Sequence, residues 1–374
     1  MVIIIKPTYS CNFRCKYCYL GNSTKESSKM FNASFVQNAI SQIKDYVIEV
    51  KSRKKVTFIW HGGEPLLWGV ENFRLVFEFM EDVLSDIDYS NSIQTNLSLL
   101  TEEYVDLFLK YNVHVGFSVD GFRELNDSQR VLTNGRGTYD LIIDRLNLAR
   151  AKGLSMGCII VGTKNSIGRV EELYKFVGDN RLNFKFNPLF ISGEARNNDE
   201  ELGITTGEYA DMTIELFDLW YNDTENRITE SNFVEIASNI LTGHTSGCLF
   251  GKNCQENFFA IAPTGDVFPC GRFCDESTAE FSYGNLHNES LTDILTRAKK
   301  SDCYNRYKYI EESSCRQCEY FHICHGGCLH DGYLRSGDFR SKTFLCSAYK
   351  RIFKHIKERI TETGLTDKAI QNGS

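Results

Sequence analysis

The sequence predicts an α/β protein that is built around a parallel sheet and continues into a cysteine-rich region. Strand-like and helix-like segments alternate through the first half of the 374 residues. Such alternation places a parallel sheet inside a layer of helices. In the second half, eight of the ten cysteines from Cys248 to Cys346 recur at spacings typical of metal ligands. These two observations define an α/β domain followed by a ligand-rich one.

The strand candidates are short segments, most of them rich in β-branched and aromatic residues. They cover residues 2–5, 56–60, 92–94, 113–117, 156–161 and 184–186. Apolar residues at helical spacing separate them, as in Val36, Ile40, Ile43 and Val47. Eight such repeats would close a full barrel, and six are too few for that.

The pattern changes after residue 191. A polar, loop-like stretch at 192–203 precedes helical segments at 209–220 and 233–241. Residues 258–261 and 267–268 flank a turn and predict a β-hairpin. The last helix, expected at 347–360, has one apolar stripe of Tyr349, Ile352, Phe353, Ile356 and Ile360.

Composition narrows the function classes. The formal net charge is −7, which argues against a general nucleic-acid surface. No apolar run approaches the roughly 20 residues of a membrane span, and the short run before Cys11 is not a signal peptide. Fourteen cysteines in a large chain without a signal predict a cytoplasmic, metal-binding protein. Cys158 lies in an apolar run and is expected in the core, whereas Cys274 and Cys303 have no clear assignment.

The most informative motif is C-x3-C-x2-C, formed by Cys11, Cys15 and Cys18. It directly follows the first strand, and α/β proteins place ligand chemistry at the carboxyl ends of their strands. Three thiolates suit an iron–sulfur cluster with one iron left open, and an open metal position can activate a small molecule. A zinc knuckle, or simply buried cysteines, is the alternative interpretation.

With Tyr17 as the aromatic residue before Cys18, this motif resembles the signature of the radical SAM enzymes. The resemblance implies a partial (β/α)6 TIM-type barrel. It also implies a [4Fe–4S] cluster whose open iron binds S-adenosyl-L-methionine, and a reductant such as flavodoxin or ferredoxin. Reduction then cleaves the cofactor to a 5′-deoxyadenosyl radical, so the three cysteines are both catalytic and metal-binding.

The same resemblance implies where the methionine part of the cofactor binds. His61-Gly62-Gly63-Glu64-Pro65 follows the second strand, and its glycines let backbone approach a ligand closely. Polar residues end the third and fourth strands and point into the same mouth, although Asn96 and Asp120 could equally cap a turn or helix. The expected cofactor contacts are Tyr17, Gly62, Gly63, Glu64, Gln94, Asn96, Ser118 and Arg130. Ser118 and Arg130 are the candidates for the carboxylate.

Two zinc sites would also fit the later cysteines, since C-x2-C pairs form zinc ribbons. Their full spacing, however, resembles the SPASM domain, which holds two auxiliary [4Fe–4S] clusters with crossed ligation. The matching positions are Cys248, Cys254, Cys270 and Cys328 for the first cluster, and Cys315, Cys318, Cys324 and Cys346 for the second. Fully ligated clusters predict electron transfer.

SPASM-bearing enzymes mostly modify peptides or proteins, and two branches compete here. In anaerobic sulfatase-maturating enzymes, which form formylglycine, an Asp base follows the third auxiliary cysteine. Gly271 takes that position here and cannot accept a proton, although Asp275 and Glu276 lie nearby. The favoured prediction is therefore a maturase of ribosomally made precursor peptides. Its product would be an intramolecular cross-link, with a C–C cyclophane ahead of a thioether.

The predicted division is a radical SAM barrel at 1–190, a helical bridge at 191–244, a SPASM domain at 245–347 and a C-terminal helix and tail at 348–374. No leader-binding domain precedes Cys11, so a precursor leader is expected to bind the SPASM part or a separate leader-binding protein. Nucleic acid and membrane are not expected partners. An iron–sulfur electron carrier and a zinc scaffold remain the alternatives outside enzymes, although neither needs a methionine pocket.

Overall fold

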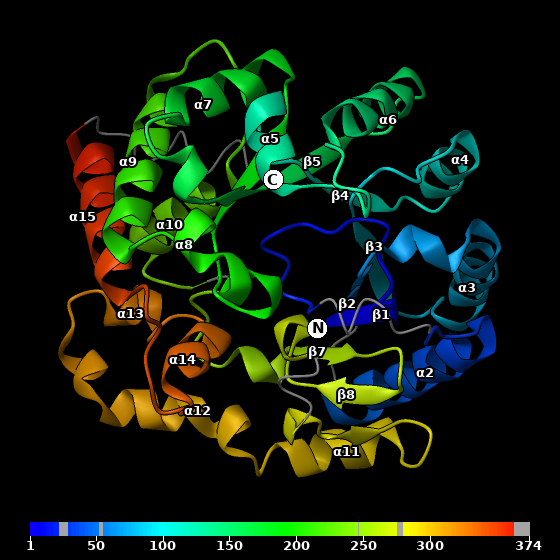
Figure 1. Cartoon of the computed structure of the whole chain (residues 1–374). Coiled ribbons are helices and arrows are strands. Elements are labelled where there is room, and N and C mark those ends of the chain that lie inside the picture. The colour runs from blue at the N-terminus through cyan, green and yellow to red at the C-terminus, as the bar shows by residue number, and fades with distance from the viewer. Residues whose placement is uncertain (22–28, 52–54, 246, 275–279, 363–374) are drawn as a thin grey trace.

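The computed structural model describes residues 1–21, 29–51, 55–245, 247–274 and 280–362. In its first half, strands alternate with helices that lie on the outer face of the sheet (Figure 1). The strands are β1 (Val2–Thr8), β2 (Lys55–Gly62), β3 (Asp88–Thr95), β4 (His114–Ser118), β5 (Met156–Gly162) and β6 (Asn183–Pro188). The helices are α2 (Ala33–Tyr46), α3 (Val70–Val83), α4 (Glu102–Lys110), α5 (Arg123–Gln129), α6 (Tyr139–Ala151) and α7 (Val170–Asp179).

These six strands pair in parallel in chain order, so the predicted partial (β/α)6 barrel is confirmed. Local signals define its elements. Asn32 caps α2 by accepting from the Phe35 amide, and Thr101 caps α4 in the same way. The faces of these helices that point inward are apolar and buried, and each large side chain withdrawn from water contributes roughly 1.5–3 kcal/mol.

Strand β3 begins earlier than predicted. Its first half is polar, and Asn91 is 3% exposed because its side chain accepts a hydrogen bond from Trp60 Nε1 at 3.0 Å. This part of the strand is thus buried through a hydrogen bond between polar side chains, which a search for apolar runs does not detect. The stretch at 192–203 also differs from a plain loop, since it contains a short 3₁₀ helix (Gly193–Asn198) and α8 (Asp199–Leu202).

The sheet does not end at β1. Within the described residues it has nine strands in the order β6-β5-β4-β3-β2-β1-β7-β8-β9. Strands β7 (Phe258–Ile261) and β8 (Asp266–Phe268) form the predicted hairpin, with Ala260 opposite Phe268. Strand β7 also pairs in parallel with β1, with Val2 opposite Phe258. A short strand, β9 (Gly284–Asn285), completes the order. The cysteine-rich domain therefore extends the barrel sheet.

Helices complete the second half of the chain. They are α9 (Thr206–Asn222), α10 (Ser231–Thr242), α11 (Leu291–Ala298), α12 (Asp302–Glu312), α13 (Phe321–Cys324), α14 (Leu329–Ser336) and α15 (Cys346–Glu362). The predicted apolar stripe of α15 is buried, and α15 packs against α9 and α10 (Figure 1). Among the described residues, no helix combines the length and apolar character needed to cross a bilayer.

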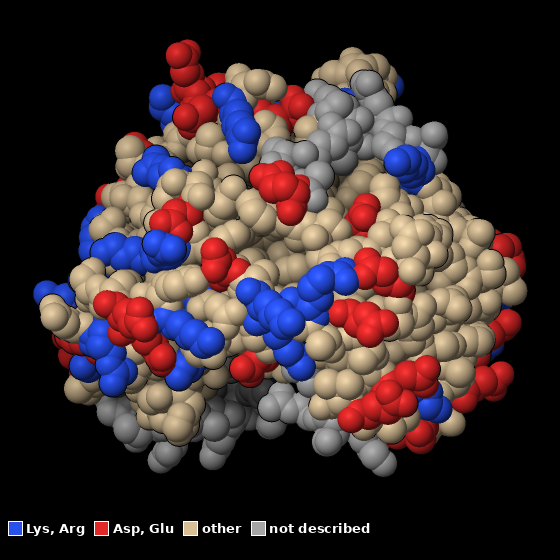
Figure 2. All heavy atoms as spheres, turned by 90° about the horizontal axis from the view of Figure 1, so that it is seen from below, with Lys and Arg blue, Asp and Glu red and all other residues tan. Residues whose placement is uncertain are grey.

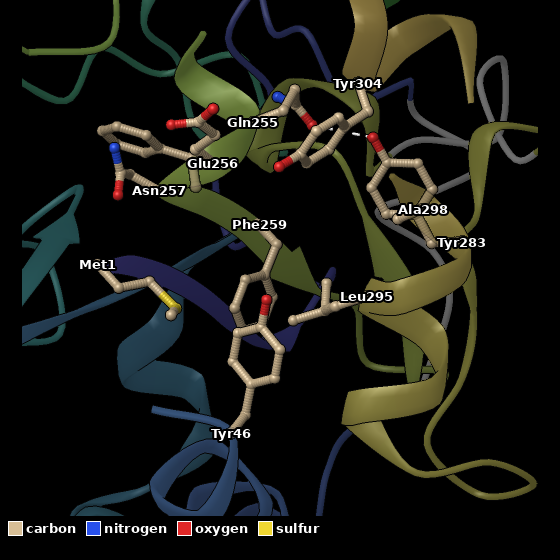
Figure 3. Close-up of a pocket in the computed structure, with 11 residues that line it drawn as sticks. Met1, Tyr46, Gln255, Glu256, Asn257, Phe259, Tyr283, Leu295, Ala298 and Tyr304 are labelled. Carbon is tan, nitrogen blue, oxygen red and sulfur yellow. Dashed lines mark hydrogen bonds between the residues drawn. The ribbon is translucent and has the colours of Figure 1, made fainter. Parts of the chain in front are cut away.

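The underside of the molecule carries both signs of charge. In the view from below, basic and acidic side chains are interspersed (Figure 2). A small cavity, lined by Met1, Tyr46 and Phe259 among others, measures about 20 Å³. Figure 3 shows aromatic rings around it and the hydrogen bond from Tyr283 to Gln255, which is 2.9 Å long. This volume holds about one water molecule, so the cavity is too small for a substrate or cofactor.

Candidate functional site: three groups of thiols

The loop that leaves β1 carries Cys11, Cys15 and Cys18, which we call the barrel thiols. Cys15 is buried and the other two are partly buried. Burial, the Glu64 carboxylate and the two neighbouring thiols raise the pKa of Cys11 to about 12. Three thiolates held this closely repel one another unless positive charge is placed among them. The donor set therefore fits a metal centre, and the structure brings the three predicted ligands together.

The segment around Arg130 holds this loop in place. The amide of Arg14 donates to the Val131 carbonyl at 2.8 Å, and the amide of Lys16 donates to the Gln129 carbonyl at 2.9 Å. The loop therefore keeps its shape through backbone bonds to a segment more than a hundred residues away. Arg130 itself is placed beside the barrel thiols by the same contacts.

Gly62 and Gly63 allow β2 to end against the start of the cysteine loop. A Cβ at Gly62 would lie 2.2 Å from the Thr8 carbonyl oxygen, and one at Gly63 would lie 2.1 Å from that of Tyr9. The amides of Gly63 and Glu64 donate to the carbonyls of Thr8 and Ser10 at 3.1 and 2.8 Å. The close approach that the sequence indicated is thus made to the protein's own backbone. A ligand ammonium group would have to use carbonyl oxygens here.

Glu64 is fully buried, and both of its carboxylate oxygens already accept hydrogen bonds. The donors are the Leu66 amide at 3.0 Å, the Thr95 hydroxyl at 2.7 Å and the Asn96 amide at 2.7 Å. Burial raises the pKa of Glu64 to about 7, and these donors oppose the rise. The carboxylate therefore ties the end of β2 to the end of β3, whereas the sequence suggested only an acceptor for the cofactor amino group.

Polar residues at the next strand ends are paired with one another. Gln94 Nε2 donates to Ser118 Oγ at 3.0 Å. Asn96 Nδ2 lies 3.8 Å from Cys11 Sγ and 2.9 Å from Asn12 Oδ1. Asn96 thus positions the cysteine loop, a role that the sequence did not indicate. Gln94 and Ser118 meet between β3 and β4, as their positions at adjacent strand ends predicted.

Arg130 forms a buried group with Tyr17 and Asp120. Tyr17 donates to Asp120 Oδ2 at 2.6 Å, and Arg130 Nη1 donates to the Tyr17 hydroxyl at 2.5 Å. Arg130 Nε is buried, and among the described residues it has no hydrogen-bond partner. An orphaned, buried guanidinium N–H beside the barrel thiols is what a bound carboxylate would satisfy. This atom makes the site fit the implied cofactor.

Cys248, Cys254, Cys270 and Cys328 form the first auxiliary set. Burial raises the pKa of Cys328 to about 12, and the Cys248 thiol adds to this shift. The pKa of Cys270 is likewise raised by burial and then by Cys328 and Cys254. These four thiols therefore lie close enough to repel one another as thiolates. Two donors face them, Gln255 Nε2 at 3.5 Å from Cys254 Sγ and Arg272 Nη1 at 3.7 Å from Cys328 Sγ.

The second auxiliary set, Cys315, Cys318, Cys324 and Cys346, lines one cavity of about 220 Å³. Burial raises the pKa of Cys324 to about 12, and the other three thiols add to it. Among the described residues, no three or more His, Cys, Asp or Glu side chains are arranged as the ligands of a metal ion. The fit of the second auxiliary set to a cluster therefore depends on its four thiols and on the cavity that they line.

The remaining cysteines are buried thiols. Cys158 is 2% exposed within β5, which confirms the predicted core position. Cys274 Sγ lies 3.6 Å from the Cys270 carbonyl oxygen, and burial raises the pKa of Cys303 to about 12. Both pack in the apolar cluster between the cysteine loop and the first auxiliary set.

Sequence reasoning missed a buried lysine that joins two of the thiol-bearing loops. Lys6 is 0% exposed and lies in β1. Its ammonium donates to the Tyr19 hydroxyl at 3.1 Å and to the Gly271 carbonyl at 2.7 Å. Tyr19 follows Cys18, and Gly271 follows Cys270. A charge inside an otherwise apolar strand was the available signal.

A parallel partial barrel with thiols after its first strand and further thiol sets in a terminal domain defines a class of iron–sulfur enzymes. Residues 5–177 match the model of the radical SAM superfamily, and residues 248–319 match that of the SPASM iron–sulfur cluster-binding domain. The chain belongs to the radical SAM superfamily and carries a SPASM domain. It uses [4Fe–4S] clusters and S-adenosyl-L-methionine as cofactors.

The chain is similar in sequence to one protein over nearly its full length and to another over little more than half. A cysteine-type anaerobic sulfatase-maturating enzyme of Clostridium perfringens is 24% identical over 372 residues, which is 96% of each chain. An uncharacterized protein of Methanothermobacter thermautotrophicus is 34% identical over 216 residues, covering 58% of this chain and 78% of that protein.

Two solved structures share the fold. The structure of native anSMEcpe with bound AdoMet and the Cp18Cys peptide has a TM-score of 0.83 at 21% identity, covering 97% of this chain and 98% of that one. Streptococcus suis SuiB, bound to the precursor peptide SuiA, has a TM-score of 0.64 at 19% identity, covering 92% and 75%.

Proposed function

We propose that this protein is a radical SAM/SPASM maturase that cross-links a ribosomally made precursor peptide. The observation that carries the proposal is Gly271, which follows the third auxiliary thiol and has no side chain to accept a proton. Its carbonyl accepts from the buried Lys6 ammonium. The likeness in fold to SuiB, a protein bound to a precursor peptide, supports a peptide substrate.

The surroundings of Gly271 leave little room for any side chain at this position. A Cβ there would lie 3.1 Å from Ile4 Cδ1 and 3.9 Å from Lys6 Cε. A side chain at this position would require the Ile4 side chain to move by a few tenths of an ångström. The position is therefore closely packed around a glycine.

The proposed ligands of the radical-generating cluster are the barrel thiols. Bound there together, the reduced cluster and S-adenosyl-L-methionine supply a 5′-deoxyadenosyl radical that removes one hydrogen atom from the substrate. Arg130 Nε and Ser118 Oγ hold the cofactor carboxylate, and carbonyls of the Gly62–Gly63 segment accept from its amino group. Asn96 and Glu64 keep the cysteine loop and strand ends in register around it.

Closing a C–C or C–S bond from a carbon radical also releases one proton and one electron. The two auxiliary thiol sets are the proposed ligands of two [4Fe–4S] clusters. The first set is the proposed electron-accepting site, because Cys254 and Cys270 share an apolar cluster with Cys18. Flavodoxin or ferredoxin supplies the reducing electron. The precursor leader binds the SPASM part or a separate protein. The proposed domains end at residues 190, 244 and 347, and a C-terminal helix and tail follow. Residues 363–374 of this tail lie outside the described part of the chain.

Formylglycine formation is the second candidate. The match to the cysteine-type sulfatase-maturating enzyme spans nearly the whole chain, and the structure that contains AdoMet and a peptide has the same fold. Asp275 and Glu276, the substitute bases that the sequence offers, lie outside the described residues.

One assay separates the two candidates. The anaerobically reconstituted enzyme, with dithionite as reductant, is given the Cp18Cys peptide in one reaction. In the other it is given each short peptide that a search of the neighbouring genome sequence identifies as a candidate precursor. We expect 5′-deoxyadenosine release and a cross-linked product of a candidate precursor that lacks two hydrogens and keeps its sulfur. A hydrazide-reactive aldehyde on the Cp18Cys peptide would establish the formylglycine reaction instead and refute the cross-linking proposal.

A further inference from the structure

Arg306, on α12, is a buried arginine that neither the family signature nor the proposed reaction uses. Its side chain is 7% exposed. Nη1 donates to the Gly327 carbonyl at 3.0 Å, and Nη2 donates to the Gly326 and Ser341 carbonyls at 3.1 and 3.0 Å. Nε is buried and has no hydrogen-bond partner among the described residues.

The carbonyls that Arg306 holds lie in the segment where the two auxiliary sets meet. Cys324 belongs to the second set and Cys328 to the first, and only three residues separate them. Gly326 and Gly327 adopt φ angles of 81° and 69°, which favour glycine. We call residues 324–328 the crossover, because this segment has a proposed ligand of the second cluster at one end and one of the first cluster at the other. The Arg306 guanidinium holds the two glycines in its middle.

The charge of Arg306 also faces both sets. Burial lowers the pKa of this group, while Cys328 and Cys254 of the first set and Cys315 and Cys324 of the second favour its charged form. Arg272 provides a contrast, because the thiols that act on it (Cys328, Cys270 and Cys248) all belong to the first set. Arg306 therefore carries a buried positive charge beside the segment that joins the two thiol sets.

We infer that Arg306 is a positioning residue shared by the two auxiliary clusters, which fixes their separation and raises the reduction potentials of both. The inference rests on the ligand sets of the proposed function. A cation close to a cluster stabilises the reduced, more negative form, and charge and hydrogen bonding are known determinants of cluster potential. Because burial weakens solvent screening, one charge can act on two neighbouring sites.

The test compares Arg306→Gln with Arg306→Lys in a Cys11→Ala, Cys15→Ala, Cys18→Ala background, so that only auxiliary clusters remain. Gln keeps an N–H for the carbonyls and loses the charge, whereas Lys keeps the charge. EPR-monitored redox titration measures both potentials. We expect the Gln variant to shift both electron equilibria about tenfold toward oxidation, about 59 mV for one electron. The Lys variant is expected to stay near the parent.

Arg297→Gln is the matched control, since Arg297 on α11 is half exposed and pairs with Glu289. Iron and sulfide are counted in every protein. If the parent itself lacks two auxiliary clusters, the proposed ligand sets fail. If it has them and Arg306→Gln leaves the potentials unchanged, or moves only one, the shared role of Arg306 is refuted. Iron lost from both sites in the Gln variant but kept in the Lys variant supports it.

Discussion

The barrel thiols come from a single loop of eight residues, whereas the auxiliary thiols come from segments spread between Cys248 and Cys346. Around the barrel thiols lie an orphaned guanidinium N–H and paired polar strand ends. The second auxiliary set instead supplies four thiols to one cavity. An open site needs polar groups to hold its cofactor, whereas the proposed auxiliary clusters would take every ligand from the chain.

The strongest test of this contrast is the loss of a barrel thiol. Cys15→Ala should abolish 5′-deoxyadenosine formation, because two thiols cannot hold the cluster that binds the cofactor. The nucleoside is measured by chromatography after anaerobic incubation with dithionite. Cleavage that persists in this variant would overturn the assignment of the barrel thiols.

Loss of an auxiliary thiol should act on a different step. Cys270→Ala is expected to keep 5′-deoxyadenosine formation and to block the cross-linked product, since the electron released on bond formation has no acceptor. Product and nucleoside are quantified in the same reactions by mass spectrometry. Normal product yield without the first auxiliary cluster would remove its proposed role.

A substitution of Arg130 tests whether the site at the barrel thiols binds the cofactor, as the auxiliary sites are not expected to. Arg130→Gln should weaken S-adenosyl-L-methionine binding by roughly 1.5–3 kcal/mol, about 10- to 100-fold, because a charge-assisted hydrogen bond to its carboxylate is lost. Calorimetry on the reconstituted enzyme measures the dissociation constant. Arg123→Gln, at an exposed arginine that pairs with Asp140, is the control. Equal affinities in both variants would place the carboxylate elsewhere.

Glu64 should make the stability of the barrel depend on pH. Its pKa is about 7 in the folded state and near its ordinary value of 4.5 when unfolded, so the folded state binds more protons between these values. The free energy of unfolding therefore falls as pH rises from about 4.5 to about 7, by roughly 1–3 kcal/mol. Urea titrations of the apo-protein should show a smaller fall in Glu64→Gln than in wild type. The exposed Glu103→Gln variant should behave as wild type.

The smallest effect is expected at a thiol that belongs to neither region. Cys158→Ala should cost about 1 kcal/mol of stability, since it leaves a small cavity in β5. Iron content and 5′-deoxyadenosine release should stay unchanged. Loss of iron in this variant would show that Cys158 is a ligand after all.

The sequence predicted those parts of the molecule that local signals specify. Apolar runs located all six barrel strands, and short spacings located the thiols. It missed the polar start of β3, because the buried Asn91–Trp60 hydrogen bond has no hydrophobic pattern. It also missed the tie between Glu64 and Asn96 and the crossover held by Arg306, which join residues distant in the chain. Such contacts form only when the chain has folded, and they produce no periodic pattern in the sequence.

The parallel pairing of β1 with β7 has a consequence for how the protein is made. Val2 leaves the ribosome well before its partner Phe258, which follows 256 residues later in the chain. At typical synthesis rates the delay is on the order of 10–50 s. Throughout that interval one side of β1 is an unpaired strand edge able to recruit other chains. Nascent-chain length should therefore govern aggregation, with the hazard ending once the hairpin emerges.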